Sequence, residues 1–133
     1  MIDAHAHLVP PDLPARIAAD GARLGVRLGS DGCVAFASGE TSRPLLPGLL
    51  DPPRPAGCDV QIVSPWVDLL GYGLDAEQGA GWARLLNAAM AGRTALATAP
   101  LQDGRAAAGE LAWALGHGFL GVEIGRASCR ERV

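Results

Sequence analysis

Apolar and polar positions along this chain follow two periods, one typical of strands and one typical of helices. Short apolar runs bounded by Pro, Gly or Asp predict buried strands, because a strand covered on both faces has few polar positions. Such runs lie at 1–8, 59–64, 94–99 and 119–124. Apolar residues also alternate on both sides of Gly29-Ser30-Asp31-Gly32, which predicts an antiparallel hairpin over 26–36, after the first strand.

Three segments between these runs carry helix signals. Asp12 precedes a predicted helix over 14–24, in which Pro14 falls in the first turn, where a missing N–H costs little. Asp75 begins a second helix, because a glutamine three residues later completes a capping pair and apolar residues then recur at helical spacing. Asp103 begins a third, which ends at a pair of glycines. Strands that alternate with helices predict an α/β fold in which a parallel sheet is covered by helices.

Composition narrows the classes of function. Hydrophobic residues make up 49% and charged residues 19%, as in ordinary globular proteins. A formal net charge of -3 provides no basic patch, so we expect neither nucleic acid nor a membrane surface as a partner. No signal-peptide pattern and no apolar run of about 20 residues is visible. The cysteines Cys33, Cys58 and Cys129 lack metal or disulfide spacing. We therefore expect a cytoplasmic protein.

His5 and His7 are the candidate metal ligands. Side chains at i and i+2 of a strand lie on the same face, so both imidazoles project together, with Asp3 one step earlier. Two neutral imidazoles can hold Zn²⁺. The place of the pair in the first strand and the Pro10-Pro11 that follows favour a metal site over two hydrogen-bonded surface histidines. Asp3 is either an acceptor that orients one imidazole or a satisfied buried carboxylate.

The stretch Ile2-Asp3-Ala4-His5-Ala6-His7-Leu8-Val9-Pro10 resembles the opening of the amidohydrolase-related family typified by aminocarboxymuconate semialdehyde decarboxylase. Further stretches resemble that family in the same order, namely Arg43-Pro44 before Leu50-Asp51-Pro52, then 59–61, 69–73, 97–103 and 121–125. The resemblance implies a zinc-containing (β/α)8 barrel. A closed barrel needs about 250 residues, and this chain has 133. We therefore expect the N-terminal half of a TIM-like barrel over 1–125, with the hairpin as a small insertion after strand 1. The chain departs from the family in having shorter connections before Asp59 and after Met90.

The resemblance also implies the chemistry. Members of the family decarboxylate, or in some cases hydrate or hydrolyse, small unsaturated carboxylic acids with a divalent metal. His5 and His7 match the first two metal ligands, and Arg43 matches an arginine that binds a substrate carboxylate. The family's other ligands and its catalytic base come from later strands, so the catalytic residues are unknown. We expect a metal-dependent carboxy-lyase, of which the present chain is a fragment that is inactive alone. For the full-length protein, the assembly considered is a homodimer. A hydrolase on the same scaffold and a non-catalytic half-barrel are the alternatives.

Several other residues have a second interpretation. Without the family match, Arg43 is a loop residue in a solvent-facing ion pair. Trp66 follows the second predicted strand and is a candidate to line the substrate pocket. Glu123 ends the fourth predicted strand, where we favour an ion pair or an outer contact over metal ligation. His117 lies at a helix end, where it interacts with the helix dipole.

The last residues break the pattern of the chain. Residues 126–133 contain three arginines without any period. The stretch resembles a translated sequencing adapter, so we expect a non-native tail and place the end of the native sequence near Glu123. The alternative is a natural basic tail.

Overall fold

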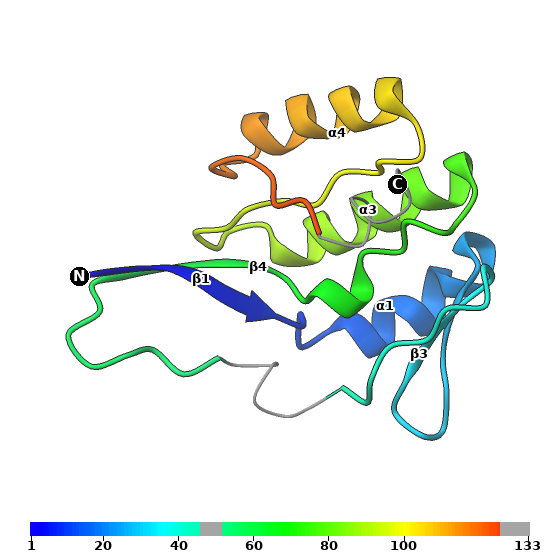
Figure 1. Ribbon diagram of the computed structural model, residues 1–133, viewed down its shortest axis with the longest axis horizontal. Helices are drawn as coiled ribbons and strands as arrows, with labels where there is room; N and C mark the ends of the chain where they lie inside the picture. The colour runs from blue at the N-terminus through cyan, green and yellow to red at the C-terminus, as the bar shows by residue number, and fades with distance from the viewer. Residues whose placement is uncertain (46–51, 126–133) are drawn as a thin grey trace, which may run out of the picture.

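The computed structural model describes residues 1–45 and 52–125. The expected tail at 126–133 and the Leu50-Asp51 part of one motif lie outside these residues. The described elements are β1 (Ile2–Leu8), α1 (Leu13–Asp20), η1 (Gly21–Leu24), β2 (Val26–Leu28), β3 (Val34–Phe36), β4 (Val60–Pro65), η2 (Val67–Leu69), α3 (Ala76–Met90) and α4 (Gly104–Gly116). Figure 1 shows their arrangement along the chain.

The expectation of half a (β/α)8 barrel is wrong. The described residues form a small mixed α/β fold with three α-helices and four strands, and these strands make two separate two-stranded sheets. The predicted third and fourth strands, 94–99 and 119–124, take part only in isolated parallel bridges, which join Val63 to Ala95 and Ala97 to Val122.

Turns and a proline border these two segments. Gly92 and Gly118 each turn the chain at a positive φ just before them, at 87° and 86°. Pro100, which has no N–H to donate, follows the first segment. These features border the two segments along the chain, whereas the neighbours that pair with them lie elsewhere in it.

Helices α3 and α4 begin where the sequence predicts. The Asp75 side chain accepts a hydrogen bond from the Gln78 N–H at 2.8 Å, and Asp103 accepts one from Ala106 at 2.9 Å. Asp12 also precedes its helix, but its side chain makes no cap bond. It pairs instead with Arg16 at 2.8 Å. The predicted helix over 14–24 ends as an α-helix at Asp20 and continues as the 3₁₀ turn η1.

The hairpin predicted over 26–36 is confirmed. β2 and β3 pair antiparallel, with Val26 opposite Phe36 and Arg27 opposite Ala35. Val26 and Phe36 are buried in the core, whereas Arg27 is exposed. One face of this small sheet therefore packs inward and the other faces solvent, as period-2 alternation requires.

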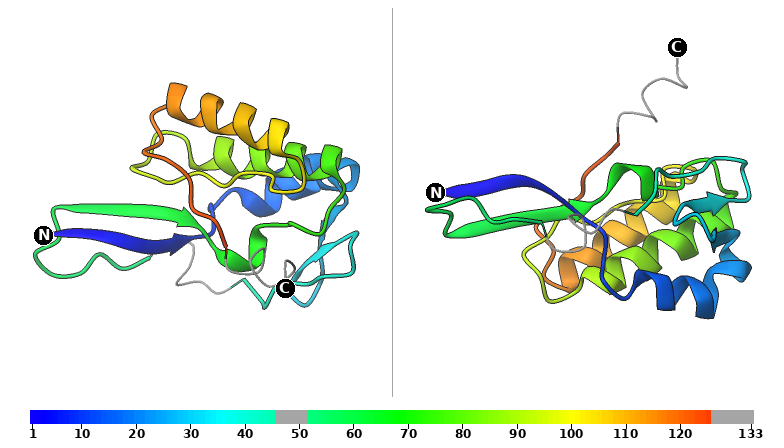
Figure 2. Two further views of the ribbon diagram at one scale, coloured as in Figure 1. Left: turned by 45° about the horizontal axis from the view of Figure 1, so that its top comes forward. Right: turned by 90° about the horizontal axis from the view of Figure 1, so that it is seen from below.

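The helices lie side by side on one side of the parallel β1–β4 pair (Figure 2). Helix α3 contacts both α1 and α4. Ala6 and Leu8 of β1 pack in one hydrophobic cluster with Met90 of α3 and Ala114 of α4. The alternate residues of β1 consequently face away from the helices. The longest helix in the described part of the chain has 15 residues, and none there has the length and apolar character of a membrane span.

A buried polar network joins α3, α4 and the segment between them. The amide of Asn87, which is fully buried, donates to the Thr98 carbonyl at 2.9 Å and accepts from the Thr98 N–H at 2.9 Å. It also donates to Glu110 at 2.9 Å, and Arg84 donates to the same carboxylate at 2.9 Å. The neighbouring residue Ala97 accepts a hydrogen bond from the Glu123 N–H at 2.9 Å. The network thus anchors the backbone from which Glu123 projects.

Candidate metal centre

Strand β1 presents both histidines on its face away from the helices. The β1–β4 register runs from Asp3 opposite Gln61 to Ala6 opposite Val63, so β1 contains one extra residue between these pairs. Such a bulge re-aims nearby side chains and is common beside functional sites. The His5 and His7 rings meet edge to face, with centroids 4.7 Å apart and an interplanar angle of 79°. The two imidazoles therefore converge, as the sequence predicts.

Glu123 joins the histidines. The ligand atoms of His5, His7 and Glu123 all lie within 4.8 Å of one another. Neighbouring strands are about 4.8 Å apart, so a flat row of β1, β4, 94–98 and 121–123 would separate its ends by about 14 Å. Since the side chains of the first and last segments meet, the row curves toward the face opposite the helices.

The donor set suits a divalent metal. Ligands around a tetrahedral zinc at about 2.0–2.1 Å are about 3.3 Å apart, so modest side-chain rotations would bring these donors to bonding distance. Two histidines and one glutamate make up a ligand set found in catalytic zinc sites, in which a further position stays open. His5 is exposed, whereas His7 and Glu123 are half-buried. The cluster is thus accessible to an ion from solvent.

The sequence favours an ion pair or an outer contact over metal ligation for Glu123, and the structure brings its carboxylate beside the two imidazoles. The signal for this residue was its position at the end of the fourth apolar run. Its distance from β1 depends on the curvature of the row, which a single sequence does not encode in any local pattern.

Asp3 contacts neither imidazole through a hydrogen bond in the described structure. Its carboxylate accepts from the Gln61 side-chain amide at 3.1 Å and from the His5 backbone N–H at 3.2 Å. The pKa of Asp3 lies below its ordinary value. The hydrogen bond from the Gln61 side chain is the largest cause, and the hydrogen bond from the His5 backbone N–H is the second. Asp3 therefore supports the backbone of the bulge, and of the two roles considered, a satisfied carboxylate describes it better than an acceptor for a ring N–H.

Ser64, on the neighbouring strand β4, contacts the candidate ligand His7. It lies opposite His7 in the β1–β4 register, and its Oγ is 3.3 Å from His7 Nδ1. Ser64 is only 3% exposed. In the sequence this serine marks only the end of a predicted strand, because cross-strand register is not readable from a single chain.

Arg43 is held in an ion pair with Asp68. Its Nε and Nη2 donate to the two carboxylate oxygens of Asp68 at 3.0 Å each, and its backbone N–H donates at 2.9 Å. The guanidinium carbon also lies 5.2 Å from the centroid of the Trp66 ring. The side-chain bonds from Arg43 lower the pKa of Asp68, and those to Asp68 raise the pKa of Arg43. The carboxylate that Arg43 binds in this structure belongs to the protein itself.

The pair between Asp68 and Arg43 predicts a pH-dependent contribution to stability. Because the folded-state pKa of Asp68 is lowered, the contribution is fully present above the ordinary aspartate pKa of about 3.9 and is lost as the pH falls through the lowered value. At neutral pH, Asp68→Asn should lower the melting temperature by about 2–4 °C. The difference from wild type should vanish in strong acid. Asp20→Asn, which breaks a looser exposed pair with Arg23 at 3.4 Å, is the matched control. An equal effect of both variants at every pH would contradict the prediction.

Trp66, Asp75 and His117 have structural positions. Trp66 is 4% exposed and belongs to the core cluster that contains Leu69. Asp75 caps α3. His117 is the C-cap of α4, where its Nδ1 lies 2.7 Å from the Trp113 carbonyl and its ring stacks on Trp113. None of the three lies in the histidine–glutamate cluster.

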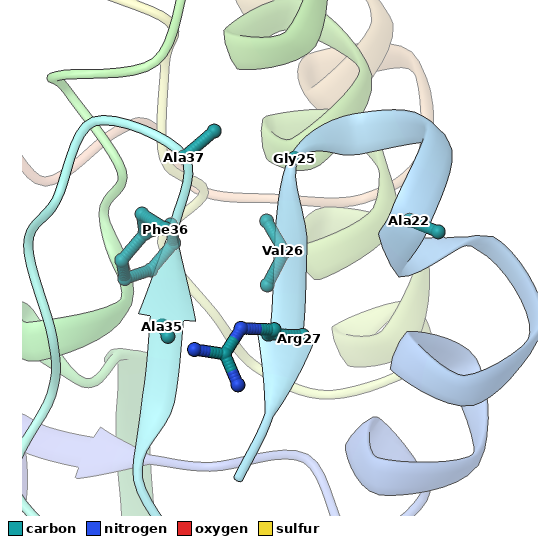
Figure 3. Close-up of a pocket in the computed structure, with 7 residues that line it drawn as sticks. All are labelled: Ala22, Gly25, Val26, Arg27, Ala35, Phe36 and Ala37. Atoms are coloured by element: carbon teal, nitrogen blue, oxygen red, sulfur yellow. The ribbon is translucent and has the colours of Figure 1, made fainter.

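Hollows also lie elsewhere on the described surface. One of about 330 Å³ covers the outer face of the hairpin, where Arg27 reaches from β2 toward Ala35 on β3 (Figure 3). A second, of about 260 Å³, includes Asp68 and Tyr72 in its wall. Neither hollow shares a residue with His5, His7 or Glu123.

No protein-family model matches this chain, and no curated protein matches its sequence. Function must therefore be inferred from the chemistry of the residues themselves.

Proposed function

We propose that this chain binds a divalent metal ion, with Zn²⁺ preferred, through His5, His7 and Glu123. We propose further that the site serves a carboxy-lyase reaction on a small unsaturated carboxylic acid in the cytoplasm. The observation that carries the metal site is the convergence of three ligand atoms within 4.8 Å. The reaction class is supported by the resemblance of residues 2–10 and the later stretches to the amidohydrolase-related family.

The ligands suit such a reaction in charge and in access. Two neutral imidazoles and one carboxylate would leave a divalent site with a net positive charge, which attracts an anionic substrate. The bound ion would supply Lewis-acid polarisation of a substrate oxygen or activation of a water. His5 is exposed, so a small acid can reach this ligand from solvent.

Arg43 is the proposed group for binding the substrate carboxylate. Its side chain is 69% exposed although Asp68 occupies two of its donors. A guanidinium has five N–H donors, and Nη1 makes no hydrogen bond to any residue that the structure describes. A substrate carboxylate can therefore bind the remaining edge while Asp68 holds the arginine in place.

A metal-dependent hydrolase is the second candidate, and the ligand set is compatible with it. Two histidines and a glutamate are the zinc ligands of several hydrolases, in which activated water attacks an ester or amide. Both candidates use the same protein ligands. They differ in product, because a carboxy-lyase releases CO₂ and a hydrolase releases an alcohol or amine.

The zinc site is tested by Glu123→Gln. The amide keeps the size of the side chain but removes the negative charge and one strong ligand oxygen, so zinc affinity should fall by at least about 100-fold. Calorimetric titration of the apoprotein with Zn²⁺ measures this loss. Glu77→Gln, which removes an exposed carboxylate in the first turn of α3, is the matched control and should bind as wild type does. Unchanged affinity in Glu123→Gln would remove this residue from the ligand set.

The reaction class needs its own assay. The expectation of an inactive fragment rested on the half-barrel, which the described fold does not form, so the chain itself is assayed. The zinc-loaded protein should release CO₂ from a small unsaturated carboxylic acid, and a chelator should stop the release. An ester or amide of similar size tests the hydrolase alternative under the same conditions. Hydrolysis without CO₂ release would replace the carboxy-lyase by the hydrolase, whereas zinc binding without either activity would leave a metal-binding protein.

A further inference from the structure

The contact between His7 and Ser64 bears on how a metal could bind. A neutral imidazole carries one N–H and one lone pair, and only the nitrogen with the lone pair can bind a metal. Which nitrogen that is depends on the hydrogen bond made by the other. For His7 the bonded nitrogen is Nδ1, 3.3 Å from Ser64 Oγ.

We propose that Ser64 is a positioning residue of the metal centre, which holds His7 through Nδ1 and leaves Nε2 to bind the ion. This inference rests on the proposed metal site at His5, His7 and Glu123. In the metal-bound state Nδ1–H donates to Ser64 Oγ, and the lone pair on Nε2 points away from the serine. The ring then has one orientation in which it can act as a ligand.

The position of Ser64 suits this role. It lies directly opposite His7 in the parallel register, and it is 3% exposed, so water does not compete strongly for the imidazole N–H. Trp66, two residues after Ser64, donates its backbone N–H to the Leu8 carbonyl at 3.1 Å. The backbone on the C-terminal side of both partners is thus held in place.

A hydroxyl also differs from a carboxylate or a carbonyl in this position. Serine can both donate and accept. It can therefore donate to Nδ1 before metal binds and accept from Nδ1–H afterwards. His7 can change tautomer without losing its partner, which a carboxylate would not allow.

The test compares three variants of the full chain by zinc titration and by ¹⁵N spectra of the histidine rings. Ser64→Ala should weaken zinc binding by about 10–100-fold, the range typical when an outer partner of a metal-binding histidine is removed. Ser64→Thr keeps the hydroxyl and should restore affinity to within a few-fold of wild type. Ser42→Ala removes another buried hydroxyl, one that bonds Val34 and Arg43 instead, and should leave zinc affinity unchanged. Melting curves of the apoproteins identify any variant that fails to fold.

The spectra keep the inference testable if a variant is unstable. In zinc-loaded wild type, His7 should carry its proton on Nδ1 and the metal on Nε2. Metal on Nδ1, or wild-type zinc affinity in Ser64→Ala, would overturn the role of Ser64 while leaving the metal site intact. Absence of zinc binding in wild type would instead overturn the proposed function itself, so the two failures are distinguishable.

Discussion

Replacing His5 and His7 together by alanine should abolish zinc binding to this protein. The double variant leaves Glu123 as the one remaining member of the cluster, and a single half-buried carboxylate holds zinc far more weakly than three ligands do. Elemental analysis after dialysis should find about one zinc per wild-type chain and only background metal in the double variant.

The remaining histidine provides the control for this experiment. His117→Ala removes an imidazole that stacks on Trp113 at the end of α4, outside the cluster, and the variant should retain its zinc. His5 is exposed and His7 half-buried, so the double variant should remain folded, which its melting curve can verify. Unchanged metal content in the double variant would reduce the two histidines to a structural pair.

Asn87→Ala should destabilise the fold by about 3–5 kcal/mol. The substitution leaves the N–H and carbonyl of Thr98 and one side of Glu110 without their partner in a buried region, and each such loss costs about 1–3 kcal/mol. A domain of this size is stable by only about 5–15 kcal/mol, so the loss is a large fraction of the total. Urea denaturation should show a lower midpoint with an unchanged slope.

A second amide on α3 is the matched control. Gln78 is half-buried, and its side chain makes no hydrogen bond to any residue in the described ranges. Gln78→Ala should therefore change stability by less than about 1 kcal/mol. An equally small effect of Asn87→Ala would show that the network between α3, α4 and Thr98 contributes little to the fold.

The local elements were predictable because their signals are local. Asp75 and Asp103 satisfy N–H groups within one turn of themselves, and helical spacing sets the buried face of α3 from its own residues. The hairpin follows from alternation on both sides of one turn. The pairing of His5 and His7 likewise depends only on the two-residue period of a strand, and it survives the bulge that begins after Asp3.

Features that depend on contacts between distant segments were not predictable in this way. Apolar runs at 94–99 and 119–124 have the composition of strands, but the number of backbone bonds that they make depends on neighbours elsewhere in the chain. Ser64 and Glu123 join the site through cross-strand register and through the curvature of the row. Trp66 follows a strand, as pocket residues often do, yet it lies in the core cluster that also contains Leu69.

The wide separation of the site residues along the chain has a consequence for how the protein is made. A ribosome adds about 5–20 residues per second, so His5 and His7 leave it several seconds before Glu123 is added. During that interval the nascent chain offers an ion only two neutral imidazoles. The third ligand arrives after the helices α3 and α4 have been synthesised and the segment that carries it has docked beside Ala97. Binding of zinc by all three proposed ligands would thus begin only after residue 123 has been added, and a chain interrupted before that residue would release its ion readily.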